Sequence, residues 1–164
     1  MTDPAALPYR PCAGVMLINR NGQVFVGQRL DSTLEAWQMP QGGIDPGEDA
    51  RTAAIRELGE ETGVSAEQIE LIAEAPNEMF YDLPPELVGK VWKGRWRGQR
   101  QRWFLFRLLG DDRAIDIATA HREFRSWRWA EPDDLPAMIV PFKKALYEAV
   151  LAAFRPHLAA DRRG

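Results

Sequence analysis

Three glutamates lie close together in residues 56–61 (RELGEE). On a helix, Glu57, Glu60 and Glu61 stand at positions i, i+3 and i+4 and therefore share one face. Like charges at these spacings repel, and Gly59 costs roughly 1 kcal/mol more than alanine inside a helix. A hard cation such as Mg²⁺ offsets the repulsion, because carboxylate oxygens are its ligands. The pattern indicates either a metal site or a solvated acidic face.

A segment rich in glycine and proline precedes these glutamates and predicts a loop that leads into their helix. Residues 38–48 (QMPQGGIDPGE) hold too many glycines and prolines for regular structure. The helix is expected from about Asp49 to Thr62, and Gly63 is a suitable residue just past its end. Leu58 points away from the glutamates and would pack on a sheet.

The remaining apolar segments predict that sheet and a second helix. The run AGVMLIN, an Asn-Gly turn signal and the run VFVGQ indicate a β-hairpin near the N-terminus. The expected elements are strands at 13–19, 24–28, 69–74, 101–109 and 126–130 and an amphipathic helix at 142–154, with residues 1–12 extended and 82–99 irregular. This order favours an α/β (α+β) domain with antiparallel or mixed pairing over a doubly wound parallel sheet.

Size and composition limit the class of protein. The chain of 164 residues suits one domain over 1–164, with 1–8 and 156–164 expected as flexible tails. A net charge of −3 excludes a uniform basic field, so DNA is not an expected partner. The single cysteine allows no internal disulfide, and neither a membrane span nor a signal peptide is visible. We expect a cytoplasmic monomer that does not bind membranes.

The glutamates belong to a longer pattern that runs from Gly42 to Val64. It reads glycine, five residues, Glu48, seven residues, Arg56 and Glu57, an aliphatic residue, any residue, two glutamates, any residue, glycine and an aliphatic residue. This segment resembles the Nudix box at all nine specified positions in 23 residues. In this context a metal-dependent hydrolase replaces the solvated acidic face as the main hypothesis.

The resemblance implies the Nudix fold, an α/β/α sandwich with a mixed sheet and a catalytic loop and helix. It implies hydrolysis of a nucleoside diphosphate linked to another group. Glu57, Glu60 and Glu61, together with Gly42, would hold divalent ions, with Mg²⁺ expected and Mn²⁺ or Zn²⁺ as substitutes. Arg56 would orient the glutamates, and either Glu57 or Glu61 would act as general base.

Four positions in the region of the box have structural roles in the family. The glutamate that matches Glu48 caps or braces the junction of loop and helix. The glycines that match Gly42 and Gly43 keep the backbone close to the metal and the phosphates, where a side chain would obstruct them. Gly63 ends the helix.

Segments outside the box resemble the bacterial RNA pyrophosphohydrolases and the related plant-type diadenosine tetraphosphate hydrolases. These segments are YRPCAGVMLIN at 9–19, WQMPQGG at 37–43, GQRQRWFLF at 98–106, EFRSWRW at 123–129 and PFKKALY at 141–147. The resemblance spans roughly residues 9–154. It implies that Glu123 is a fourth acidic metal ligand, whereas alone it would be interpreted as a surface glutamate.

The resemblance also assigns contacts with the substrate. Arg10 and Arg29 match arginines near the 5′ phosphates, a task that suits guanidinium because it stays charged and pairs with phosphate in a fork. Ordinary ion pairs are the alternative for these arginines, and ordinary packing is the alternative for the aromatic positions. The other positions expected to bind substrate are Gln41, Tyr81, Val140, Phe142 and Lys143.

A local basic segment lies between Leu87 and Gly110. It contains seven basic residues, no acidic one and three interleaved tryptophans. Such a mixture suits a single-stranded nucleic acid, although strand alternation would send some of these side chains into water.

Three functions remain open at this point. The main hypothesis is an RNA 5′ pyrophosphohydrolase that converts 5′-triphosphate RNA to 5′-monophosphate RNA and so initiates mRNA decay. The second is a dinucleoside polyphosphate hydrolase that splits diadenosine tetraphosphate into ATP and AMP. The third is an inactive Nudix-like binding module, against which the intact box argues.

Overall fold

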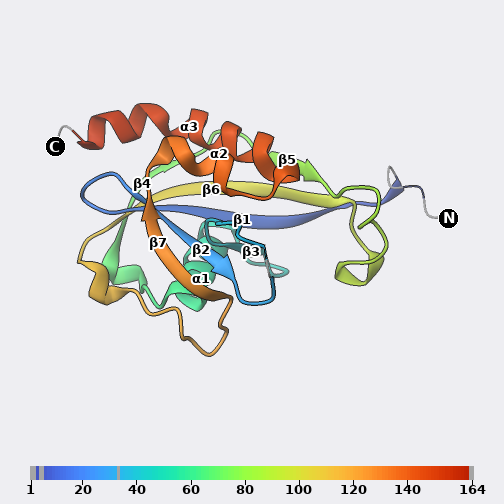
Figure 1. Ribbon diagram of the computed structural model, residues 1–164, viewed down its shortest axis with the longest axis horizontal. Helices are drawn as coiled ribbons and strands as arrows, with labels where there is room; N and C mark the ends of the chain where they lie inside the picture. Colours follow the sequence, from blue (N-terminus) through green and yellow to red (C-terminus); the bar gives the residue numbers. More distant parts are fainter. Residues whose placement is uncertain (1–2, 4–5, 33, 163–164) are drawn as a thin grey trace.

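A mixed sheet forms the centre of the molecule, with helices on both of its faces (Figure 1). The computed structural model describes residue 3 and residues 6–32 and 34–162. In spatial order the described strands are β4 (Ile69–Glu74), β6 (Gly98–Leu108), β1 (Tyr9–Ile18), β2 (Val24–Arg29) and β7 (Phe124–Ala130), with β3 (Gln41–Gly43) beside β1 and β5 (Met79–Asp82) beside β6. Strands β1 and β6 run parallel, and the other neighbours run antiparallel.

The helices make this sheet the middle layer of a sandwich. Helix α1 (Ala50–Thr62) lies on one face, and α2 (Leu135–Met138) and α3 (Lys144–Arg162) lie on the other (Figure 1). The predicted α/β/α sandwich with a mixed sheet is therefore confirmed. Within the part of the chain that the structure describes, no helix has the length and apolar character needed to cross a membrane.

Strand β1 runs through the middle of the sheet and contributes to both cores. Met16 and Ile18 belong to the core beneath α3, whereas Val15 and Leu17 belong to the core beneath α1. All four side chains are fully buried. A strand covered on both faces is apolar along its whole length, which explains the continuous run in the sequence.

The predicted hairpin turn is present, but its strands soon separate. Asn19 Oδ1 accepts the backbone N–H groups of Asn21 and Gln23, and Gly22 takes a φ of 74°. Strands β1 and β2 are paired at Ile18 and Val24, at the turn. Farther along, β3 lies beside β1 where a hairpin would place β2, because the loop before α1 folds back onto β1.

Several expected boundaries were wrong. The arm predicted for 1–12 becomes strand β1 from Tyr9, because Tyr9 pairs with Gly98 of β6. The predicted loop 38–48 contains β3, and the predicted irregular segment 82–99 begins with the end of β5. These pairings join residues far apart in sequence, so no local pattern announces them.

The C-terminal helix is longer than expected. It was predicted to end at residue 154, with a flexible tail at 156–164, but α3 continues through Pro156 to Arg162. The physical reason is burial, because Leu158 is 5% exposed and packs into the core under α3. The remaining positions of the two expected tails, 1–2, 4–5 and 163–164, lie outside the described residues.

Candidate active site

Helix α1 is fixed at both ends by the residues expected to bound it. The Asp49 carboxylate accepts the N–H of Thr52 at 2.7 Å, which makes Asp49 the N-cap. Gly63 follows the helix with a φ of 75° and donates its N–H to Gly59 O at 2.9 Å. A Cβ at Gly63 would lie 2.9 Å from the carbonyl oxygen of Asp116, so both backbone conformation and space require glycine.

The loop before α1 is tied to the sheet and to α3. The N–H of Met39 donates to the hydroxyl of Tyr147 on α3 at 2.8 Å, and Val15 of β1 donates to Pro40 O at 2.9 Å. Gly42 then pairs with Ala13 of β1. The loop is therefore part of the rigid scaffold, and its short strand β3 lies against the side of α1 that carries the glutamates.

Gly42 allows the closest approach between loop and helix. A Cβ on Gly42 would lie 2.1 Å from Cδ of Glu57, which is inside the carboxyl group. The neighbouring glycine, Gly43, has the same relation to Arg10, whose Nη2 would lie 2.6 Å from an added Cβ. Side chains at either position would displace a group expected to act in the site.

Arg56 connects the loop to the glutamates of the helix. Its guanidinium donates to both carboxylate oxygens of Glu48 at 2.8 and 2.9 Å and to the carbonyl oxygen of Gly43 at 2.9 Å. Nη1 donates to Glu57 at 2.9 Å and to Glu60 at 3.4 Å. The Arg56 guanidinium, with the backbone N–H of Asp45, lowers the pKa of Glu48 to about 2. This geometry is what the bracing role of Glu48 and the orienting role of Arg56 require.

Glu61 is the most deeply buried of the expected metal ligands. The residue is 2% exposed, and its Oε2 has no hydrogen-bond partner. Burial, followed by the nearby charges of Glu57 and Glu123, raises the pKa of Glu61 well above its ordinary value. Burial also raises the pKa of Glu57. An unpartnered buried carboxylate costs free energy unless a cation approaches it, so these residues fit a divalent metal.

The acidic groups lie around one space without being drawn together. Within residues 6–32 and 34–162, no three acidic, histidine or cysteine side chains form a tight metal-binding group. Their like charges repel one another, and Arg56 is the cation that α1 itself places among the glutamates. A cation between them would offset that repulsion.

Glu123 reaches the same space from another part of the chain. The loop before β7 is held against α1, because Asp116 N–H donates to Thr62 O at 2.8 Å and the Thr119 hydroxyl donates to Glu60 O. Glu123 O accepts the N–H of Leu30 at 2.7 Å, which places the residue beside the end of β2. The loop therefore carries Glu123 to the glutamate side of α1.

A cavity of about 390 Å³ brings most of the sequence-predicted residues together. The predicted residues that line it are Arg10, Arg29, Gln41, Gly42, Gly43, Glu57, Glu60, Glu61, Tyr81, Glu123 and Lys143. Phe142 lies behind Tyr81, with ring centroids 5.9 Å apart, and is 38% exposed. Val140 is half-buried against the core under α3. Neither of these two positions lines the cavity.

The cationic residues of the cavity already have partners. Arg29 forms a bidentate pair with Asp31 at 2.7 and 2.8 Å, so the ion pair considered as an alternative is present beside the cavity. Arg10 lies over the ring of Trp92, 5.9 Å from its centroid. Lys143 Nζ lies 5.1 Å from the ring centroid of Tyr81, and burial lowers the pKa of Lys143 to about 8. All three could turn toward a polyphosphate.

Sequence reasoning missed other residues of this cavity. Gln38, Trp92, Gln99 and His121 also line it. Gln38 lies within the quoted segment WQMPQGG and Gln99 within GQRQRWFLF, so their motifs pointed to the region without singling them out. His121 is exposed at the rim, near Glu123. Trp92 is one of the tryptophans interleaved in the basic segment, which indicated nucleic acid, but its place at this cavity depends on the fold of the segment between β5 and β6.

Comparison with known proteins identifies the family. The NUDIX domain model matches residues 8–150. The chain belongs to the Nudix family. It is 61% identical over 157 residues to an RNA pyrophosphohydrolase of Cereibacter sphaeroides, covering 96% of this chain and 97% of that protein. It is also 61% identical over 156 residues to an RNA pyrophosphohydrolase of Sphingopyxis alaskensis, covering 95% of this chain and 99% of that protein.

A solved structure extends the comparison. The binary complex of a C. elegans Ap4A hydrolase is similar with a TM-score of 0.69 and 25% identity, covering 92% of this chain and 98% of that one. The predicted family and fold are confirmed. As a Nudix hydrolase the chain is an enzyme that acts on phosphoanhydride bonds, and such enzymes generally use divalent metal ions.

The basic segment of this Nudix hydrolase is less basic than its sequence indicated. Antiparallel pairing brings acids of β4 and β5 and the loop between them beside Arg97 and arginines of β6. The resulting ion pairs are Arg97–Asp82, Arg100–Glu78, Arg102–Glu74 and Arg107–Glu70. Trp103, one of the three interleaved tryptophans, is fully buried and donates its Nε1–H to Gln101. An uninterrupted basic patch is therefore absent from residues 87–110.

Loss of the Glu48 brace should weaken the fold. We expect Glu48→Gln to lower the free energy of unfolding at pH 7 by about 2 kcal/mol, because a partly buried guanidinium loses a charged, bidentate partner. The pKa of Glu48 is lowered, so the pair stabilises the protein above the ordinary carboxyl pKa of 4.5 and is lost as pH falls toward about 2. Urea unfolding at pH 7 and pH 3 measures both effects, with the exposed Glu148→Gln as control. A constant difference between the two pH values would contradict this account.

Neutralising Glu61 should have the opposite effect on the metal-free protein. The pKa of Glu61 is raised in the folded protein. Its contribution to the free energy of unfolding is therefore fully present below pH 4.5 and is lost as pH rises through the pKa of the folded state. We expect Glu61→Gln to melt at a higher temperature than the unaltered protein in EDTA at pH 8, and the gap to narrow toward pH 5. Mg²⁺ should raise the melting temperature of the unaltered protein more than that of Glu61→Gln. An equal Mg²⁺ response would remove Glu61 from the metal site.

Proposed function

We propose that this chain is an RNA 5′ pyrophosphohydrolase that converts 5′-triphosphate RNA to 5′-monophosphate RNA. The observation that carries the proposal is the cavity in which four glutamates face cationic side chains from β1, β2 and the turn just before α3. Carboxylates and a polyphosphate repel each other, so cations must lie between them for the polyphosphate to bind here. The 61% identity to proteins named RNA pyrophosphohydrolases supports the same substrate.

The roles of the residues follow from the cavity. Glu57, Glu60, Glu61 and Glu123, with the backbone of Gly42, would hold the divalent ions, for which Mg²⁺ is the proposed species and Mn²⁺ or Zn²⁺ a substitute. When bound, such ions neutralise phosphate oxygens and lower the pKa of the attacking water. The P–O bond to the leaving phosphate breaks as water adds to phosphorus, and pyrophosphate or successive orthophosphates leave.

Cationic and aromatic residues would hold the rest of the substrate. Arg10 and Arg29 are placed to pair with the polyphosphate, since guanidinium binds phosphate oxygens in a fork. Tyr81 and Lys143 face the cavity from the other side and would contact a base. The proposal includes a monomer, because one chain supplies all of these groups, and it places the enzyme in the cytoplasm.

A dinucleoside polyphosphate hydrolase is the second candidate. The similarity to a C. elegans Ap4A hydrolase favours it, as does the Tyr81 ring beside the cavity. Both reactions need the same metal ligands and differ in the group that the polyphosphate carries, an RNA chain or a second nucleoside. An inactive binding module is disfavoured, because every specified position of the Nudix box is intact and the glutamates are in place.

A direct comparison of substrates tests the proposal. The purified protein would receive 5′-triphosphate RNA or diadenosine tetraphosphate with Mg²⁺ or Mn²⁺, and kcat/KM would be compared. We expect the higher kcat/KM with RNA. A large preference for the dinucleotide would reverse the ranking of the two candidates, and inactivity on both would return the binding module to consideration.

Removal of one metal ligand tests the role of the glutamates. We expect Glu60→Gln to lower kcat by at least ~100-fold at saturating Mg²⁺, since changes to the partners of metal ligands alone cost 10–100-fold. The variant should also lose the Mg²⁺-dependent rise in melting temperature, which is measured without substrate. Glu148→Gln, an equivalent change on α3, should retain both properties. Wild-type turnover by Glu60→Gln would overturn the metal assignment.

A further inference from the structure

A second cavity adjoins the catalytic one. Its volume is about 640 Å³, within the range of sites that hold small organic molecules. Arg10, Gly43 and Glu57 line both cavities, so the two spaces adjoin beside Glu57. Trp96 and Arg100 lie on the wall that only the second cavity has. A substrate whose polyphosphate occupies the first cavity could extend into the second.

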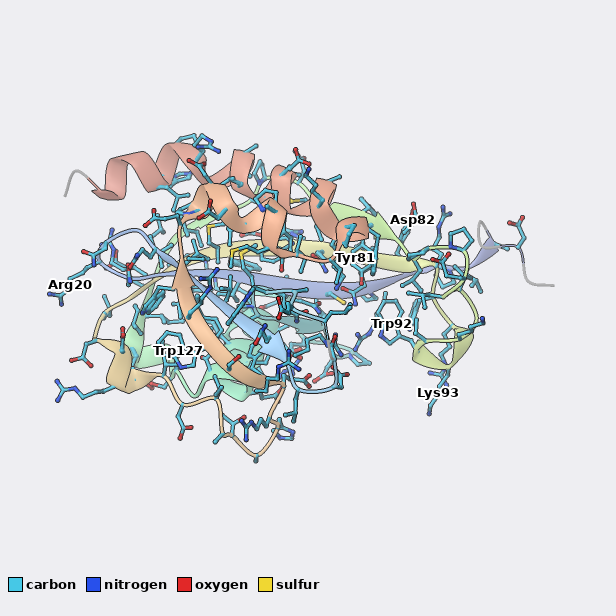
Figure 2. The ribbon with its side chains drawn as sticks, in the orientation of Figure 1. Arg20, Tyr81, Asp82, Trp92, Lys93 and Trp127 are labelled. Atoms are coloured by element: carbon cyan, nitrogen blue, oxygen red, sulfur yellow. The ribbon has the colours of Figure 1, made fainter. Side chains whose placement is uncertain are left out.

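The segment between β5 and β6 places one tryptophan at each cavity. Trp92 lines the catalytic cavity and Trp96 lines the second, with Arg10 in the wall of both. This placement depends on an unusual turn, in which Trp92 and Lys93 have φ values of 51° and 59°. Residues other than glycine rarely adopt this left-handed backbone conformation, and such backbone strain concentrates at functional sites. Figure 2 shows Trp92 turned toward the sheet and Lys93 turned away from it.

An exposed aromatic surface continues from the second cavity. Phe80 of β5 is directly opposite Arg100 of β6, so the two side chains lie on the same face of the sheet. Phe80 is 52% exposed, and Tyr9 packs edge-on against it with ring centroids 5.0 Å apart. An aromatic ring this exposed on a sheet can stack a base.

The charges around the second cavity favour a base over a phosphate as its occupant. Arg100 donates to Glu78 at 3.0 Å, and Arg102 is bonded to Glu74. These pairs cancel most of the positive charge that a phosphate would need. They leave the Trp96 side chain as the chemically distinctive part of the wall, and an aromatic side chain suits a flat aromatic ring.

We propose that the second cavity binds a nucleobase of the substrate RNA against Trp96, with Phe80 as the next stacking surface along the chain. This inference rests on the proposed function and specifies which nucleotides the enzyme recognises. The RNA beyond its 5′ polyphosphate then passes over the junction of β5 and β6. Diadenosine tetraphosphate has no chain of further nucleotides to extend over this surface, and so does not reach Phe80.

Variants at the two aromatic positions test the proposal. Trp96→Leu and Phe80→Ala would be assayed with a 5′-triphosphate RNA of eight nucleotides, one of two nucleotides, and diadenosine tetraphosphate. We expect each variant to raise KM for the longer RNA by about 10-fold with little change in kcat, as loss of one stacked base predicts. Trp96→Phe should restore most of the loss. Phe80→Ala should leave KM for diadenosine tetraphosphate unchanged.

Controls separate this inference from the proposed function. Trp127→Leu makes the same change on β7, far from Trp92 in Figure 2, and should leave KM unchanged. Binding of a fluorescent 5′-hydroxyl octanucleotide, measured by anisotropy without metal, should weaken in Trp96→Leu and depend only shallowly on salt. Equal binding of this octanucleotide by the unaltered protein and by Trp96→Leu would overturn the inference even if RNA hydrolysis is observed. If Trp96→Leu raised KM for diadenosine tetraphosphate as much as KM for the octanucleotide, the cavity would instead be assigned to the second nucleoside of the dinucleotide.

Discussion

Arg56 makes the acidic site compatible with a folded protein. Its guanidinium lies among Glu48, Glu57 and Glu60 and also bonds to the backbone of Gly43. Without this cation, the loop and the helix would bring their carboxylates together at an electrostatic cost that burial increases. Glu61, deeper still, is not among the bonded partners of Arg56 and keeps one oxygen unpartnered. The fold therefore satisfies most of the site and leaves its deepest carboxylate available to a cation.

The parallel pairing of β1 with β6 determines what surrounds that carboxylate. The pairing extends from Tyr9 to Ile18 on β1 and places Arg10 opposite Gln99, so both reach the catalytic cavity. A parallel connection needs a long crossover, and here the crossover contains the Nudix loop and α1. This connection supplies both the helix that carries the proposed metal ligands and the strand that carries Arg10, a proposed phosphate contact. The site depends on this sheet more than on any single side chain.

The parts of the structure that were predictable from sequence are those with local causes. Helix α1 starts after Asp49 and ends before Gly63 because capping acts over a few residues. Glu123 and Arg29 have no such local signal, and only the resemblance of their segments to a known family singled them out. Strand β3, the length of α3 and the position of Trp92 depend on contacts between distant segments, which spacing does not encode. Arg97 and the paired arginines of β6 show the same limit, because their acidic partners precede them by 15 to 37 residues.

The residues that local sequence predicts and those that depend on distant contacts also differ in their proposed chemical roles. The groups that would hold metal and break the phosphoanhydride bond belong to one continuous loop and helix, where any Nudix sequence can place them. The groups that distinguish an RNA from a dinucleotide must lie farther from the scissile bond, since the two substrates are alike near it. In this chain the segment between β5 and β6 occupies that position, and it places Trp92 and Trp96 on either side of Arg10. Selectivity for substrate can therefore change with that segment while α1 and its glutamates stay the same.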